Sequence, residues 1–487
     1  MIGLLLLVPI IGSLIILPMQ ENDNNKNFMK NIALITSLIN FLVSIFLWLE
    51  FDSTTTNYQF VYEFNQLSFC HFNVGVDSIS IFFVLITTFI TPIALLSNYS
   101  NITKNIKFFL IALLILETLQ IALFVVLDLM LFYIFFESVL PILFVLIVLY
   151  GSGESRFRSA NLLFLYTLAG SLPMLLSVLV IYNYVGSTDF TIISLNEISL
   201  ESQKILWLGF FIAFAVKTPM WPLHTWLAWA HSNSPLAGSI LLAATVLKFA
   251  TYGILRVLIN FLPDATNYFS PLVQTIAIIS LIYASLTTIV QQDTKTLVAY
   301  SSVAHMAVVT LGLFSNTIIG IEGAILFAIA HAFVSPALFI CVGGILYDRY
   351  HTRTIPYLRG LVTTMPVFTI LFFIFTLGNT GVPLTLNFIA EQLCLIGIWQ
   401  MNPLTAALGA TGIVLSAVYS IWMMNRISYG VHSPHLKVAK DINRREFMLL
   451  LTLLVPTIAL GIYPNIILET LHVGVTTLLY NIPTLTP

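Results

Sequence analysis

The chain has 487 residues, of which 58% are hydrophobic and only 8% carry a charge. Soluble domains contain about 25% charged residues, so a surface made from so few charges must face lipid over most of its area. The net charge of −2 leaves no basic surface for nucleic acid.

Apolar runs of about 20 residues recur along the chain without the alternation that membrane strands show. Because only helices and closed barrels satisfy the backbone in lipid, these runs predict an all-α polytopic membrane protein. The first run lacks the cationic start and cleavage site of a signal peptide, so we expect a retained span. The fourteen predicted spans are 2–18, 30–49, 78–97, 108–126, 129–149, 160–184, 205–229, 235–260, 271–290, 297–315, 320–346, 363–399, 404–425 and 446–470.

Two parts of this assignment have alternatives. Residues 108–149 could form one long helix, although Asp128 interrupts them, and residues 363–399 could form two spans, because glycines and Pro383 break them. With the spans as above, fifteen of the nineteen lysines and arginines fall in odd-numbered loops, and merging or splitting a span spoils this segregation. We therefore expect two spans over 108–149, one broken span over 363–399, and both termini facing away from the cationic loops.

A faint internal repeat relates spans four to eight to spans nine to thirteen. The matched prolines are Pro173 and Pro336, Pro222 and Pro383, and Pro235 and Pro403. Since each copy has five spans, the second copy is inverted, and each contains one broken helix, an arrangement typical of membrane carriers. The predicted organisation is three N-terminal helices over 1–106, a first repeat over 107–260, an inverted second repeat over 266–428, and a loop with a last helix over 429–487.

Among the cations, Lys217 and Lys248 lie in the middle of spans, whereas Lys295 is assigned to an odd loop and Arg256 to a span end. A charge at mid-bilayer is costly and is usually functional. Glu137 in span five is the natural partner of Lys217, and moving the acid away would loosen the proton on that lysine. A fixed ion pair that only holds helices together is the alternative.

Further ionisable residues lie inside later spans. Lys248 has no acid near it in sequence, which favours a proton carrier. His305 and His331, on successive spans, favour a relay, although each could be an ordinary hydrogen-bonded core histidine. Glu391 follows the break in span twelve and suits proton release. For Glu117 in span four, a structural and a proton-transfer role are equally open.

Nothing in the sequence indicates a cofactor or a metal. The three cysteines lie far apart, and no Cys/His cluster or phosphate-binding glycine loop is present. The cysteines are Cys70, Cys341 and Cys394.

Three stretches resemble the antiporter-like membrane subunits of respiratory complex I: FYIFFESVLPI, the run from Lys217 to Arg256, and VAYSSVAHM. The resemblance covers spans four to thirteen. It implies fourteen spans with inverted repeats, a place beside other membrane-arm subunits and lipids in the mitochondrial inner membrane or a bacterial plasma membrane, and no NADH, flavin, iron–sulfur or quinone site in this chain. Cationic loops would face the matrix or cytoplasm.

The resemblance also implies residue roles. Glu137 and Lys217 would form the input pair, Lys248 the central relay, and Glu391 the exit acid, with His305 and His331 linking them. The chain departs from the family pattern in a predicted loop at Ala228–Asn233, which has lost its usual proline and acid.

Proton translocation along these buried groups is the function that the sequence favours. One alternative is a cation/proton antiporter subunit, which would show sodium-dependent transport. Another is a passive subunit whose ion pairs only fix helix packing, and a third is a solute carrier.

Overall fold

A computed structural model describes residues 1–63 and 72–480; Cys70 lies outside this range. In the first half, the elements are α1 (Ile2–Ile16), α2 (Asp23–Leu49), β1 (Gln59–Tyr62), β2 (Val74–Val76), α3 (Ser80–Ser97), α4 (Ile106–Val125), α5 (Leu129–Tyr150), α6 (Arg156–Val185), α7 (Phe190–Ser194), α8 (Leu200–Lys217), α9 (Thr225–Asn233), α10 (Leu236–Leu241), η1 (Leu242–Val246), α11 (Lys248–Gly253) and η2 (Ile254–Ile259).

The second half continues with helices in place of every remaining apolar run. They are α12 (Pro263–Ile289), α13 (Thr294–Leu313), α14 (Ile318–Phe339), η3 (Ile340–Ile345), α15 (Leu346–Tyr350), η4 (Ile355–Tyr357), η5 (Leu361–Thr363), α16 (Pro366–Asn379), α17 (Leu386–Met401), α18 (Pro403–Ser428), α19 (Arg444–Ile462) and α20 (Asn465–Tyr480).

Eleven helices in the described ranges are long and apolar enough to cross a membrane. The other three predicted spans fall on α1, which has only 15 residues, and on the broken pairs α8–α9 and α16–α17. The last predicted span ends early, because α19 stops at Ile462 and a separate helix, α20, follows Pro464. The chain is therefore a multi-span helical membrane protein, as expected.

Each of the two ambiguous regions contains two helices. Asp128 ends the run at 108–149: its carboxylate accepts hydrogen bonds from the backbone N–H groups of Met130 and Leu131 and so caps α5. Between α16 and α17 the chain is non-helical over 380–385, where Gly381 has a φ of 66° and Pro383 lacks an N–H.

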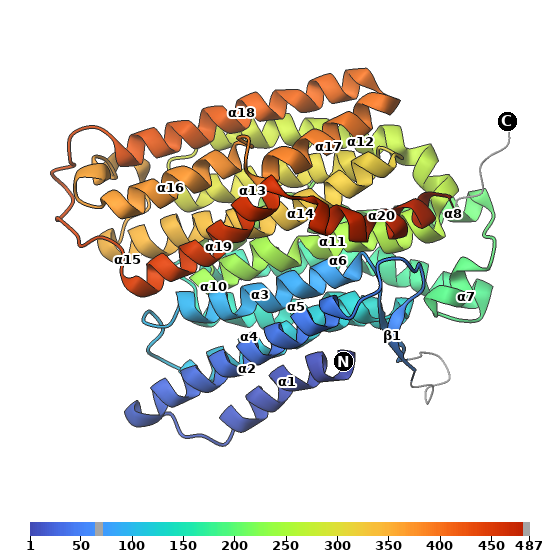
Figure 1. The fold of residues 1–487 in the computed structure, drawn as a ribbon, viewed down its shortest axis with the longest axis horizontal. Helices are drawn as coiled ribbons and strands as arrows, with labels where there is room; N and C mark the ends of the chain where they lie inside the picture. Colours follow the sequence, from blue (N-terminus) through green and yellow to red (C-terminus); the bar gives the residue numbers. More distant parts are fainter. Residues whose placement is uncertain (64–71, 481–487) are drawn as a thin grey trace. The chain divides into compact units, whose positions relative to one another are not determined.

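The chain divides into two compact units. Unit 1 comprises Met1–Thr218, Thr245–Ser270 and Glu469–Pro487, and unit 2 comprises Pro219–Ala244 and Pro271–Leu468. This division cuts across the four segments predicted from sequence, which describe repeats rather than compact units. In unit 1, α1 packs against α2 and α4, and α6 packs against α5 and α8 (Figure 1). In unit 2, α14 packs against α13 and α17, and α18 runs beside α16 and α17 (Figure 1).

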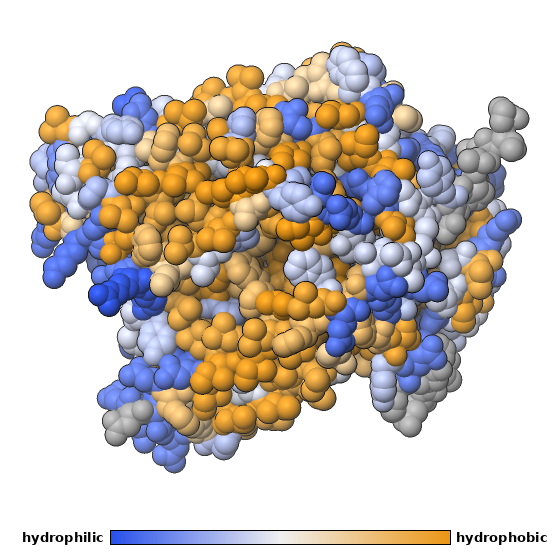
Figure 2. Space-filling model, viewed as in Figure 1, coloured by the Kyte–Doolittle hydropathy of each residue, from blue (hydrophilic) through white to orange (hydrophobic). Residues whose placement is uncertain are grey.

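The surface confirms a lipid-facing protein. Figure 2 shows one face on which hydrophobic side chains cover the long sides of the helices, while hydrophilic side chains gather near helix ends. On α1, for example, Leu4, Leu7 and Leu14 are all exposed. A continuous band of exposed leucines, rather than any single exposed leucine, indicates that the surrounding medium is itself apolar.

Candidate functional site

Three predicted site residues of unit 1 come together around an aromatic cluster. Lys217 ends α8 and is 1% exposed, and its Nζ lies 4.8 Å from the centre of the Phe136 ring. That ring also packs against Phe214 of α8 and Phe249 of α11. Because Phe136 precedes Glu137 and Phe249 follows Lys248, the cluster places α5, α8 and α11 side by side at their ionisable residues.

Glu137 and Lys217 do not form a salt bridge. Neither residue belongs to an ion pair within 4.0 Å in the described part of the chain, although their charges interact at longer range. The Ser171 hydroxyl on α6 lies near the Glu137 carboxylate but donates its hydrogen bond to the Leu168 carbonyl, at 3.1 Å. The two residues of the predicted input pair are therefore near each other but not in direct contact. This geometry does not support a fixed ion pair that holds the helices together.

The end of α8 leaves backbone polar groups beside Lys217. The helix stops there because Pro219 and Pro222 cannot donate backbone hydrogen bonds, and α9 starts only at Thr225. Non-helical backbone at membrane depth is tolerated where it is buried in protein or lines a hydrated cavity. The break expected from the sequence is thus present next to the lysine.

Lys248 lies between two π-helical segments. It is 1% exposed and begins α11, with η1 on one side and η2 on the other. Single π turns inside α-helices are frequent at functional sites. Close packing accompanies them: a Cβ at Gly253 would lie 2.4 Å from the Phe214 ring, so only glycine allows α11 to approach α8 here.

Unit 2 holds the other three predicted residues. His305 on α13 and His331 on α14 face each other, with ring centroids 5.8 Å apart. Glu391 on α17 is 5% exposed. Cys394, three residues further along the same helical face, contacts α13 and α14 beside Gly312 and Gly323. The Glu391 carboxylate itself lies beside the break between α16 and α17, where a Cβ at Gly381 would be 2.8 Å from its Oε2.

Glu117 lies apart from these two groups. It is buried on α4, and its Oε1 accepts a hydrogen bond of 2.7 Å from Asn40 Nδ2 on α2. A helix-to-helix hydrogen bond of this kind is sufficient to explain why a polar residue is retained there.

Substitutions of Glu117 distinguish a structural role from a role in proton transfer. Glu117→Gln is expected to leave assembly and proton transport near wild type, because the amide oxygen can still accept from Asn40. Glu117→Ala strands the Asn40 donor and should cost about 1–3 kcal/mol of stability. Thermal unfolding of the purified complex measures the second effect; loss of proton transport in the glutamine variant would instead assign Glu117 to proton transfer.

The structure corrects three sequence assignments of polar residues. Residues 228–233 are not a loop but the second half of α9, where His231 is buried and stacks on Phe339 with ring centroids 4.6 Å apart. Arg256 is not at an open span end but is buried in η2. Lys295 is not a loop residue but is 3% exposed in the first turn of α13. An N-cap rule applied to Asp293 would have placed Lys295 inside that helix.

Arg256 forms a buried ion pair with Asp77, just before α3. Its Nε also donates to the Tyr252 hydroxyl at 3.1 Å. Burial alone would raise the pKa of Asp77, but the guanidinium and the hydrogen bonds from Ser80 hold it below its ordinary value. The sequence offered no signal for this pair, because the two residues are far apart along the chain.

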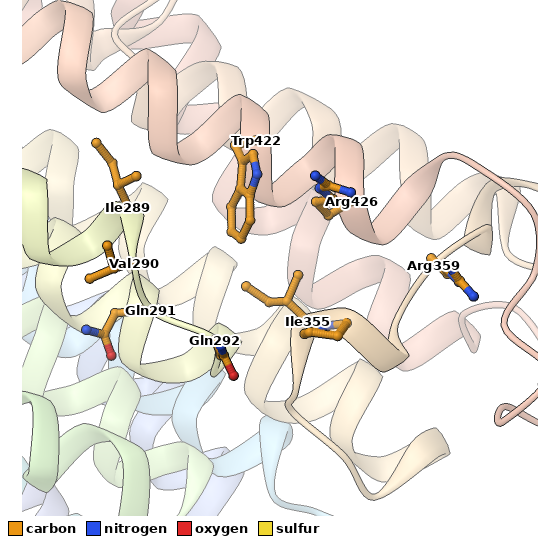
Figure 3. Close-up of a pocket in the computed structure, with 9 residues that line it drawn as sticks. Ile289, Val290, Gln291, Gln292, Ile355, Arg359, Trp422 and Arg426 are labelled. Atoms are coloured by element: carbon orange, nitrogen blue, oxygen red, sulfur yellow. The ribbon is translucent and has the colours of Figure 1, made fainter.

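A surface pocket in unit 2 contains none of the predicted site residues. It has a volume of about 500 Å³ and opens where Trp422 and Arg426 of α18 face Ile355 and the residues that follow α12 (Figure 3). In the described residues, no group of three or more His, Cys, Asp or Glu side chains is placed to hold a metal ion.

Together, these features define a helical membrane protein with ionisable groups buried inside its spans. The family model for "NADH:quinone oxidoreductase/Mrp antiporter, TM" matches residues 126–416. The chain belongs to this family.

Relatives match over nearly the whole chain. NADH-ubiquinone oxidoreductase chain 4 of Mycosarcoma maydis is 61% identical over 99% of this chain and 100% of its own length. The protein of the same name from Marchantia polymorpha is 46% identical over 97% of this chain and 96% of its own length.

Solved structures agree in fold. A chain of respiratory complex I from Thermus thermophilus superposes with a TM-score of 0.88 at 28% identity, covering 98% of this chain and 100% of that one. A chain of the Mrp complex from a Dietzia species reaches a TM-score of 0.86 at 18% identity, over 99% of this chain and 97% of that one, a likeness of fold alone.

Proposed function

We propose that this chain moves protons across the mitochondrial inner membrane as a membrane-arm subunit of NADH:ubiquinone oxidoreductase. One observation carries the proposal: a member of this family buries two groups of ionisable residues inside its spans, one in each compact unit. Its relatives are named as chain 4 of that enzyme, so the redox chemistry belongs to other subunits.

Each buried group has a proposed role. Glu137 and Lys217 receive the proton, and the open geometry between them suits a pair that separates and re-forms. Lys248 is the central relay, and its flanking π turns favour a site whose backbone can adjust. His305 and His331 pass the proton onward, and Glu391 releases it.

Electrostatic switching supplies enough energy for this sequence of steps. A change in a neighbour's charge that alters proton affinity a hundredfold is worth about 2.7 kcal/mol. Moving one charge against 100 mV costs about 2.3 kcal/mol. The two energies are comparable, so one charge movement per step is sufficient.

The finer architecture belongs to the same proposal. Fourteen spans result if α1, α8–α9 and α16–α17 are added to the eleven long helices. The helix breaks at Pro222 and Pro383 support the inverted five-helix repeats over 107–260 and 266–428, preceded by 1–106 and followed by 429–487. Cationic loops would then face the matrix, with both termini opposite.

The partners follow from membership of the complex. The chain associates with the other membrane-arm subunits, including neighbouring antiporter-like ones, and with lipids. We propose no cofactor, metal, NADH or quinone site in this chain, and no nucleic-acid partner.

A cation/proton antiporter subunit is the second candidate, favoured by the fold shared with the Mrp complex. Sodium-dependent transport would support it. A passive structural subunit is the remaining alternative, in which neutral substitutions change assembly and leave coupling intact.

The test compares two lysines on the same helix. In the complex reconstituted in vesicles, Lys217→Met is expected to lower proton transport per electron pair. Lys204→Met is the matched control: Lys204 also lies on α8 but near its first turn, where its Nζ lies over the Tyr268 ring at 3.9 Å. Unchanged proton transport in both variants, with normal assembly, would contradict the proposal.

A further inference from the structure

Lys295 is a buried lysine that the proposed proton path does not yet use. It lies in the first turn of α13, and its Nζ donates a 2.8 Å hydrogen bond to the backbone carbonyl of Ser234. Ser234 is the residue that ends α9. The hydrogen bond therefore joins a cation that is 3% exposed to a neutral carbonyl rather than to a carboxylate.

A glycine on a neighbouring helix leaves room for the Lys295 side chain. Gly343 in the π-helical segment η3 lies against the lysine stem: a Cβ at position 343 would be 3.3 Å from Lys295 Cε. The charged groups that act on it are Arg353 and Asp293, which pair with each other at 3.3 Å, and His231 lies three residues before Ser234 on α9.

This end of α13 belongs to the side of the cationic loops. The Thr294 N–H donates to the carbonyl of Arg353, which lies in the loop after α15. Both residues belong to odd-numbered loops of the predicted topology. A proton that reaches Lys295 from water therefore comes from the side of the cationic loops.

A polar track leads from Lys295 toward the histidine pair. Ser302 lies seven residues, or two helical turns, further along α13, at a rise of about 10 Å. Its hydroxyl is 3.1 Å from that of Ser335 on α14. His305 is one turn beyond Ser302, and His331 is one turn before Ser335. Residues spaced by three, four or seven share one helical face, so hydroxyls lie between the lysine and both rings.

If the cation at position 295 only held the Ser234 carbonyl in place, an arginine there would serve equally well. The neighbouring Ser232 carbonyl on α9 is in fact bonded by Arg353, which stays charged. A lysine differs in one respect that matters here: it can release its proton when buried.

We propose that Lys295 is a proton-uptake residue that supplies the His305–His331 pair of unit 2 directly. The ammonium gives one proton through water and the Ser302 and Ser335 hydroxyls to an imidazole nitrogen. The neutral amine is then reprotonated from the aqueous phase on the side of the cationic loops. This inference rests on the proposed function and adds a second route of uptake, independent of Lys217.

The decisive variant is Lys295→Arg in the intact complex. It keeps the charge and the hydrogen bond to Ser234 and removes the ability to release a proton. We expect normal assembly and at least a twofold loss of protons transported per electron pair, measured in vesicles. Lys437→Arg, on an exposed lysine of the same side, is the matched control and should change nothing.

A second variant tests the track itself. The double substitution Ser302→Ala with Ser335→Ala should reproduce the loss while leaving the lysine in place. Wild-type proton transport in both the arginine variant and the double alanine variant would overturn the inference. If the Lys295 and serine variants are normal but Lys217→Met still lowers proton transport, the proposed function stands and only the Lys295 route is rejected. If Lys217→Met is normal as well, the proposed function is also rejected.

Discussion

Replacing Lys248 with methionine is expected to stop proton movement along the route through Lys217 and Lys248 while the complex still assembles. The side chain is buried, so the methionine keeps its volume and apolar stem without its charge. A proton would then have to cross the gap with no group to hold it, at a cost of several kcal/mol. Since 1.4 kcal/mol corresponds to a tenfold change in rate, proton transport along the Lys217–Lys248 route should slow by about tenfold or more.

Lys248→Arg distinguishes proton transfer from electrostatics. Arginine retains the positive charge but does not deprotonate in proteins, so it should be as inactive as methionine. Proton transport and NADH:ubiquinone electron transfer are measured together in vesicles. A full proton-to-electron ratio in either variant would remove Lys248 from the path, and a passive structural role would be the better account.

The second large effect concerns the buried pair of Arg256 and Asp77. Arg256→Met leaves Asp77 buried without its cation, which should cost about 3–5 kcal/mol. Folded proteins are stable by only about 5–15 kcal/mol, so the amount of assembled complex should fall sharply. Native electrophoresis and thermal unfolding measure this loss.

A compensating variant is the control. Asp77→Leu combined with Arg256→Met removes both charges and should recover most of the stability, because apolar replacement of a whole buried pair is often neutral. Equal loss in the single and double variants would show that the charges are not the cause. The folded-state pKa of Asp77 is lowered, so its stabilising contribution is present near neutrality and disappears as the pH falls through that pKa.

The helices were predictable from sequence because lipid imposes a long apolar run on every span. Eleven of the fourteen predicted runs fall on helices long enough to cross a membrane, and Asp128 marked the start of α5 through its capping chemistry. The breaks near Pro222 and Pro383 were equally readable, since proline cannot donate a backbone hydrogen bond.

Other features were not readable, for identifiable reasons. The π turns beside Lys248 follow the same apolar pattern as α-helix, so periodicity does not reveal them. The polar composition of 228–233 imitates a loop, yet packing against residues such as Phe339 keeps α9 helical. The Arg256–Asp77 pair joins distant positions, and a single sequence contains no signal for such a contact.

Segments of the two compact units alternate along the chain. The polypeptide leaves unit 1 after Thr218, returns at Thr245, leaves again after Ser270 and returns at Glu469. Within unit 1, α20 lies close to the start of α3: a Cβ at Gly474 would collide with Ser78, the neighbour of Asp77. During synthesis, the first unit therefore stays incomplete until the last helix has left the ribosome, and a message that ends before codon 469 would lack the helix that packs against Ser78.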